Sequence, residues 1–114
     1  MSYFTAGTKI EKIFWIENAE TSESVDISDV VGSLYEVKTN RVVQRFDNEG
    51  ENPAPEDLGN NQFKFTFTPE ITRRCPIGVE LWFDVYAGNI ERIFRGKFGT
   101  ALQSPLSNEQ VQMS

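Results

Sequence analysis

Four side chains with catalytic or binding potential alternate within the stretch GVELWFDVYAGNIERIFRGKF, residues 78–98, and they are Glu80, Trp82, Asp84 and Tyr86. Two carboxylates could serve as general acid and general base, as in glycoside hydrolases. In an extended strand, however, Glu80 and Asp84 would lie about 13 Å apart, beyond the ~5–9.5 Å that such carboxylate pairs use. We therefore interpret these residues as the outward face of a strand.

The other reactive side chains are also poorly placed for chemistry. The acidic stretch DNEGENPAPEDLGNN, residues 47–61, lacks the alternating carboxylates and fixed glycine of an EF-hand loop. The sequence contains no histidine, so none can activate Cys75 as a nucleophile. A zinc or copper site would also lack its commonest ligand. We expect no catalytic residue, no metal and no cofactor, and we do not expect an enzyme.

Composition limits the class of partner. The chain has 114 residues, the usual size of one domain, and 17 acidic against 11 basic residues give a net charge of −6. This charge disfavours binding to nucleic acid or to an anionic membrane. Cys75 is the only cysteine, which excludes an intrachain disulfide and fits folding in a cytoplasm.

Alternation with a period of two dominates the chain and predicts strands. Phe63, Phe65 and Phe67 alternate with polar residues in NQFKFTFTP, which is typical of a strand that buries one face. The runs SLYEVKT and RVVQRF predict a hairpin that turns at Thr39 and Asn40. The sequence therefore favours an all-β fold.

The first predicted strand, KIEKIFWI, has apolar residues on both faces. Ile10, Phe14 and Ile16 share one face, and Ile13 and Trp15 share the other. A strand with two apolar faces is either buried from both sides or in contact with a neighbouring chain.

Two segments interrupt this alternation. In TPEITRRCPIG, Thr68 can cap a helix, Pro69 suits its first position and Pro76 ends it, which predicts one short helical turn near residues 69–75. Residues 47–61 are rich in Asp, Glu, Asn, Gly and Pro, and we expect a long exposed loop there.

The opening stretch predicts a second hairpin, with Gly88-Asn89 as a two-residue turn. This turn would fix the register of the two strands. The register predicts two inner pairs and two outer pairs: Phe83 with Phe94 and Val79 with Phe98 inside, and Glu80 with Lys97 and Trp82 with Arg95 outside.

The order of these segments resembles the N-terminal immunoglobulin-like domain of phage upper-baseplate proteins and related tailed-phage virion modules. The matching residues are Thr68-Pro69-Glu70, Thr72, Gly78, Phe83-Asp84-Val85 and Gly96-Lys97-Phe98, and the resemblance covers about residues 8 to 100. It implies an immunoglobulin-like antiparallel β-sandwich that serves as a virion building block. Its implied partners are other virion proteins and copies of itself.

On this basis the sequence divides into an N-terminal arm (1–7), a β-sandwich domain (8–102) and a C-terminal tail (103–114). Apolar side chains in both end segments, and on the outward faces of strands, are candidates for contact with neighbouring chains. The candidate interface residues are Tyr3, Phe4, Ile13, Trp15, Trp82, Leu106 and Val111.

Three functions are open from the sequence. The first is a structural virion protein of a tailed bacteriophage, in the tail, baseplate or connector region, made in the host cytoplasm before assembly. The second is a capsid decoration or head-fibre anchoring protein. The third is a small carbohydrate-binding sandwich in which Trp15, Trp82 and Tyr86 would stack on sugar rings.

Overall fold

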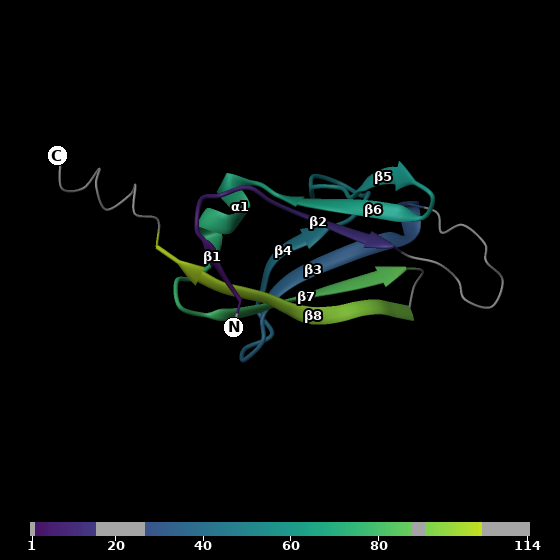
Figure 1. Ribbon diagram of the computed structural model, residues 1–114. Coiled ribbons are helices and arrows are strands. Elements are labelled where there is room, and N and C mark those ends of the chain that lie inside the picture. Colours follow the sequence, from purple (N-terminus) through teal and green to yellow (C-terminus); the bar gives the residue numbers. More distant parts are fainter. Residues whose placement is uncertain (1, 16–26, 88–90, 104–114) are drawn as a thin grey trace.

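Two β-sheets lie face to face in the computed structural model, which describes residues 2–15, 27–87 and 91–103 (Figure 1). One sheet has the strand order β1-β8-β7-β3-β4 and the other has the order β2-β6-β5. A single 3₁₀ turn (Ile27–Asp29) precedes β3, and one short helix, α1, follows β6. The elements are β1 (Tyr3–Thr5), β2 (Ile10–Trp15), β3 (Val30–Glu36), β4 (Val42–Phe46), β5 (Glu56–Gly59), β6 (Gln62–Phe67), α1 (Pro69–Arg74), β7 (Glu80–Ala87) and β8 (Glu91–Leu102).

The strand order is that of an immunoglobulin-like sandwich. Strands β2, β6 and β5 take the places of B, E and D, and β8, β7, β3 and β4 take the places of G, F, C and C′. These ladders are antiparallel, whereas β1 pairs in parallel with the end of β8. The predicted all-β, immunoglobulin-like sandwich is confirmed, with one parallel strand pair added to it.

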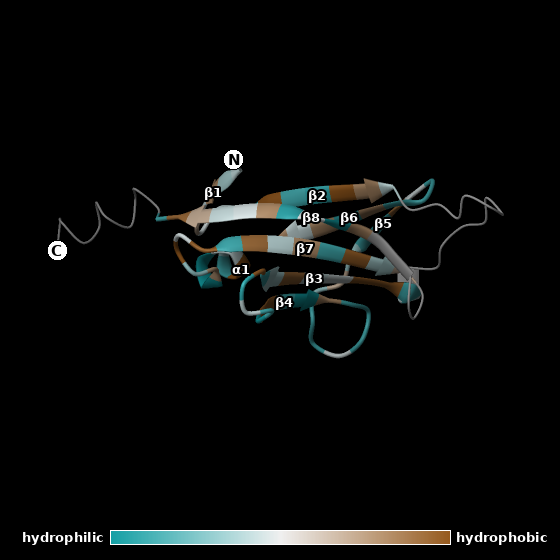
Figure 2. Ribbon diagram, turned by 90° about the horizontal axis from the view of Figure 1, so that it is seen from below, coloured by the Kyte–Doolittle hydropathy of each residue, from teal (hydrophilic) through white to brown (hydrophobic). Residues whose placement is uncertain are grey.

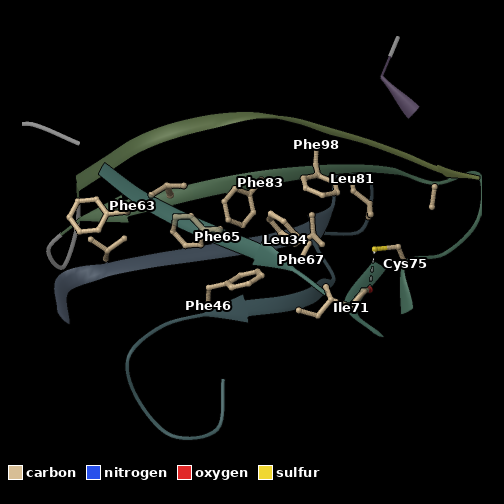
Figure 3. Close-up of a cluster of buried hydrophobic side chains, with 13 residues drawn as sticks. Leu34, Phe46, Phe63, Phe65, Phe67, Ile71, Cys75, Leu81, Phe83 and Phe98 are labelled. Carbon is tan, nitrogen blue, oxygen red and sulfur yellow. Dashed lines mark hydrogen bonds between the residues drawn. The ribbon is translucent and has the colours of Figure 1, made fainter. Parts of the chain in front are cut away.

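Phenylalanine rings fill the space between the sheets (Figure 3). Phe63, Phe65 and Phe67 of β6 are each at most 1% exposed, as their alternation predicted. The ring centroid of Phe83 on β7 lies 5.1 Å from that of Phe65 and 5.8 Å from that of Phe14 on β2. In antibody domains a disulfide joins the strands equivalent to β2 and β7, and here a ring contact links them.

A glycine on β3 makes room for these rings. A Cβ atom at Gly32 would lie 2.7 Å from Phe65 Cε2 and 2.7 Å from Phe83 Cζ. Both rings are almost fully buried, so neither can move aside without disturbing the core. The close approach of the two sheets at this point therefore depends on the missing side chain.

Helix α1 begins as the sequence predicted. Thr68 is the N-cap, its Oγ1 accepts a hydrogen bond from the Ile71 N–H at 3.3 Å, and Pro69 opens the helix. Thr72, which is fully buried, accepts a hydrogen bond from the Gly7 N–H at 3.0 Å and donates one to the Thr8 carbonyl at 2.7 Å. The helix thereby holds the connection between β1 and β2.

Part of the segment predicted as an N-terminal arm is a strand of the larger sheet. Residues 3–5 form β1 and pair with Thr100 to Leu102 of β8. Phe4 is half-buried, and its ring centroid lies 5.1 Å from that of Phe98. A three-residue strand is too short to show an alternating pattern, which is why the sequence did not reveal it.

The stretch 47–61 is mostly exposed, as predicted, but it is not a loop throughout. Its last part forms β5, which pairs with β6 at the edge of the three-stranded sheet. Asp47 at its start is buried, with 8% of its surface exposed, and Pro55 is buried as well. Pro53 and Pro55 precede the strand rather than interrupt it, so they do not conflict with its pairing.

Candidate functional site

The outward face of β7 carries the residues that first suggested chemistry. Leu81, Phe83 and Val85 are buried between the sheets, so the alternate residues lie on the outer face of the five-stranded sheet. These outward residues are Glu80, Trp82, Asp84 and Tyr86. The division into inner and outer residues of β7 agrees with the sequence analysis.

The predicted register of β7 and β8 is wrong. Phe83 lies opposite Gly96, Val85 opposite Phe94, and Trp82 opposite Lys97. Two irregularities, between Leu81 and Trp82 and between Val85 and Tyr86, each shift the pairing by one residue, as β-bulges do. The turn predicted at residues 88 and 89 lies outside the described residues.

This shift changes the environment of Phe94. The sequence placed its ring in the core opposite Phe83, whereas 38% of its surface is exposed. The ring folds over Gly96, where a Cβ atom would lie 2.5 Å from Phe94 Cζ, and its centroid is 4.8 Å from that of Phe14. Val79, predicted to pair with Phe98, precedes β7 and packs half-buried against the core.

The predicted outer contacts exist despite the different register. Lys97 Nζ lies 2.8 Å from Glu80 Oε1, and Trp82 Nε1 donates a hydrogen bond to the same oxygen at 3.3 Å. The guanidinium carbon of Arg95 lies 5.8 Å from the centroid of the Trp82 ring. The Lys97 ammonium, helped by the Trp82 N–H, holds the pKa of Glu80 below its ordinary value.

Asp84 is the centre of a buried polar network. It is 6% exposed, and its two oxygens accept hydrogen bonds from the Tyr35 hydroxyl at 2.9 Å and the Tyr86 hydroxyl at 3.2 Å. Arg95 Nε donates to the Tyr35 hydroxyl at 3.1 Å and lies 3.8 Å from Asp84. Burial, and then the hydrogen bond to Asp84, raise the pKa of Tyr35.

Sequence reasoning missed Tyr35, because it comes from β3 and is 49 residues away from Asp84 along the chain. Its one signal was its place on a predicted strand. The hydrogen bond from Tyr35 ties Asp84 on β7 to β3, and the ion pair with Arg95 ties it to β8. Glu80 is held by Lys97 and Trp82. The two carboxylates do not converge on a common point.

Two further features bear on chemistry. Cys75 is 2% exposed, and burial raises the pKa of its thiol to about 11, so at neutral pH it stays protonated and out of reach of solutes. Within residues 2–15, 27–87 and 91–103, no group of three or more His, Cys, Asp or Glu side chains is placed to hold a metal ion.

The strongest apolar exposure is on β2. Ile13 and Trp15 are 57% and 70% exposed, and they point away from the core on the outer face of the three-stranded sheet. Trp82 lies on the outer face of the opposite sheet. Trp15 and Trp82 therefore cannot stack on one sugar, and the three-ring platform considered above is not formed.

Two hollows flank the sandwich. One, of about 110 Å³, lies between β2 and β8 and has an aromatic floor of Phe14, Phe83, Phe94 and Phe98. The other is an open cleft of about 580 Å³ between β4, residues 51–53 and α1. Charged side chains of both signs line the cleft: Arg45, Glu51, Glu70 and Arg74.

The predicted interface residues that the structure describes lie on separate surfaces. Tyr3 is 52% exposed on β1, and Phe4 beside it is half-buried. Ile13 and Trp15 share β2, and Trp82 is half-buried on the opposite sheet. Leu106 and Val111 lie outside the described residues.

Among the residues that the structure describes, no helix has the length and apolar character needed to cross a membrane. Comparison of the chain with protein-family models, with curated proteins and with solved structures found no match in any of the three.

Proposed function

We propose that this chain is a structural virion protein of a tailed bacteriophage, an assembly or adaptor module in the tail, baseplate or connector region. It would fold in the host cytoplasm and bind other virion proteins through its strand edges and outer faces. The resemblance to phage upper-baseplate domains supports the virion setting, and the immunoglobulin-like strand order is consistent with that resemblance.

The observation that carries the proposal is the exposure of Ile13 and Trp15 on an edge strand. Isolated apolar residues are common on protein surfaces, but here two neighbours project from one face of a strand whose outer edge pairs with no other described strand. Tryptophan is among the residues that contribute most to binding at protein interfaces. An adaptor uses such a surface, whereas the carboxylates that might support catalysis are occupied by structural partners.

Mass spectrometry of purified particles from the phage that encodes the chain tests this proposal. We expect the chain to be present at a copy number set by the ring symmetry of a tail or baseplate. A copy number that follows the far larger number of capsid subunits would favour capsid decoration or head-fibre anchoring instead. Absence from purified particles would overturn the virion assignment.

A further inference from the structure

The four strands at the sheet edges differ in how well they are protected against pairing. Strand β1 has three residues, and β5 has four with an irregular register against β6. Strand β4 pairs irregularly with β3, and Arg74 of α1 hydrogen-bonds to its Gln44. Short length, bulges, covering elements and charged side chains, including inward-pointing ones, are the usual protections of an edge strand.

Among the described residues, β2 is neither short, bulged nor covered, and its one inward-pointing charge is Lys12. Its six residues pair with β6 in one continuous register, and it contains no proline. Figure 2 shows β2 along the margin of the sandwich, beyond β8, so the other sheet does not cover its free edge. Its outer face carries Ile13 and Trp15, the latter the most exposed of the large apolar side chains described.

We propose that β2 pairs with β2 of a second copy of this chain in an antiparallel, two-fold symmetric ladder centred on Ile13. The two three-stranded sheets would then become one six-stranded sheet. This inference rests on the proposed assembly function, since it assigns a partner to the same exposed surface. A two-fold interface uses the same patch on both copies, so the strand must be complementary to itself.

Complementarity selects the register. With Ile13 opposite the partner's Ile13, Glu11 faces the partner's Trp15 on the outer face. Glu11 can accept a hydrogen bond from that indole N–H, as Glu80 does from Trp82 within this chain. On the inner face Lys12 lies opposite the partner's Phe14, whose ring can receive a cation.

Other registers of the β2–β2 ladder are less favourable. Centring the ladder on Lys12 would set two lysines opposite each other, and centring it on Glu11 would set two glutamates opposite each other, both of which are destabilising. Centring it on Phe14 would pair only residues 13–15 of the described strand. Lys12, whose Nζ now lies 5.9 Å from the Phe98 ring centroid, is an inward-pointing charge of the kind that discourages pairing at a sheet edge. In the register centred on Ile13 it lies opposite the partner's Phe14 and not opposite a second lysine.

Sedimentation velocity on the purified full-length chain, over a wide range of concentrations, measures the self-association. We expect a monomer that converts to a dimer as the concentration rises. Ile13→Lys should abolish the dimer, because it would set two ammonium groups opposite each other on the two-fold axis. Ile77→Lys is the matched control, since Ile77 is 53% exposed, close to the 57% of Ile13, and lies outside every strand.

Disulfide trapping locates the axis even if the lysine variant folds poorly. Residues directly opposite in an antiparallel pair have Cα atoms about 4.5–5.5 Å apart, within the range of a disulfide. Under a mild oxidant, Ile13→Cys should cross-link into covalent dimers, while Ile77→Cys should not. The native Cys75 is buried and does not compete.

A wild-type chain that stays monomeric at all concentrations, or Ile13 and Ile77 variants that behave alike in both assays, would overturn the ladder. These assays need only the purified chain, so their failure is distinct from failure of the virion proposal. A dimer that forms in solution while purified particles lack the chain would leave the ladder intact and refute the virion role.

Discussion

Phe83 is the aromatic side chain on which the two sheets meet. It is 2% exposed, and rings of β2, β4 and β6 surround it. We expect Phe83→Ala to lower the free energy of unfolding by about 3–5 kcal/mol, because it leaves a cavity in a packed core. Phe94→Ala should cost clearly less, because that ring is 38% exposed.

Chemical denaturation of the two variants measures this difference. The sequence analysis placed both rings in the core as a pair, which would make the two losses similar. Equal losses would therefore restore the pairing of Phe83 with Phe94 and contradict the bulged register of β7 and β8.

Asp47 provides a pH-dependent contribution to stability. The Arg45 guanidinium, with the Glu49 N–H and the Asn52 side chain, holds the pKa of Asp47 below its ordinary value of 3.8. A carboxylate with a lowered pKa stabilises the fold above 3.8, and this stabilisation disappears as the pH falls through the pKa of the folded state.

We therefore expect Asp47→Asn to be less stable than the wild type at neutral pH, with a difference that shrinks once the pH falls below 3.8. Denaturant titrations of both proteins at a series of pH values measure it. A difference that is constant, or that widens in acid, would mean that the hydrogen bonds of Asp47 do not depend on its charge.

At the level of elements, α1 holds the connection between β1 and β2 through one hydroxyl. Thr72→Val keeps the shape of the side chain but leaves the Gly7 N–H and the Thr8 carbonyl without this partner. Because Thr72 is fully buried, we expect a loss of about 1–3 kcal/mol in unfolding free energy.

Thr39→Val is the control for this prediction. The Thr39 hydroxyl accepts a hydrogen bond from the Arg41 N–H at 3.2 Å in an exposed turn, where water can replace it. Denaturant midpoints compare the two variants. A Thr72 variant as stable as the Thr39 variant would show that the connection is held by other contacts.

The elements that the sequence predicted are those with local patterns. Phe63, Phe65 and Phe67 define β6 by alternation alone, and Thr68-Pro69 defines the start of α1. The sequence analysis did not predict strand β5, because EDLG shows no alternation of apolar and polar residues. The strand pairs with the edge of β6. The bulges of β7 and β8 and the bonds between Tyr35 and Asp84 depend on contacts distant in sequence, for which a single strand carries no signal.

At the scale of the whole molecule, the assembly proposal depends on the edge of β2 that no other described strand pairs with. The sequence already placed Ile13 and Trp15 together on the second apolar face of the first strand, either buried or in contact with a neighbouring chain. The fold leaves that face exposed on an edge strand. The sequence could not reveal that β1 pairs with the end of β8, or that β2 is an edge strand among the described elements. Strand order follows from the packing of both sheets together.

The most direct test of the assembly role is incorporation of variants into particles. The wild-type chain, Ile13→Lys and Ile77→Lys, each supplied in place of the native copy, would be quantified by mass spectrometry of purified virions, with circular dichroism to establish folding. We expect the wild type and Ile77→Lys at full copy number and a strong loss of Ile13→Lys. Full incorporation of a folded Ile13→Lys chain, or absence of the wild type from particles, would contradict the account.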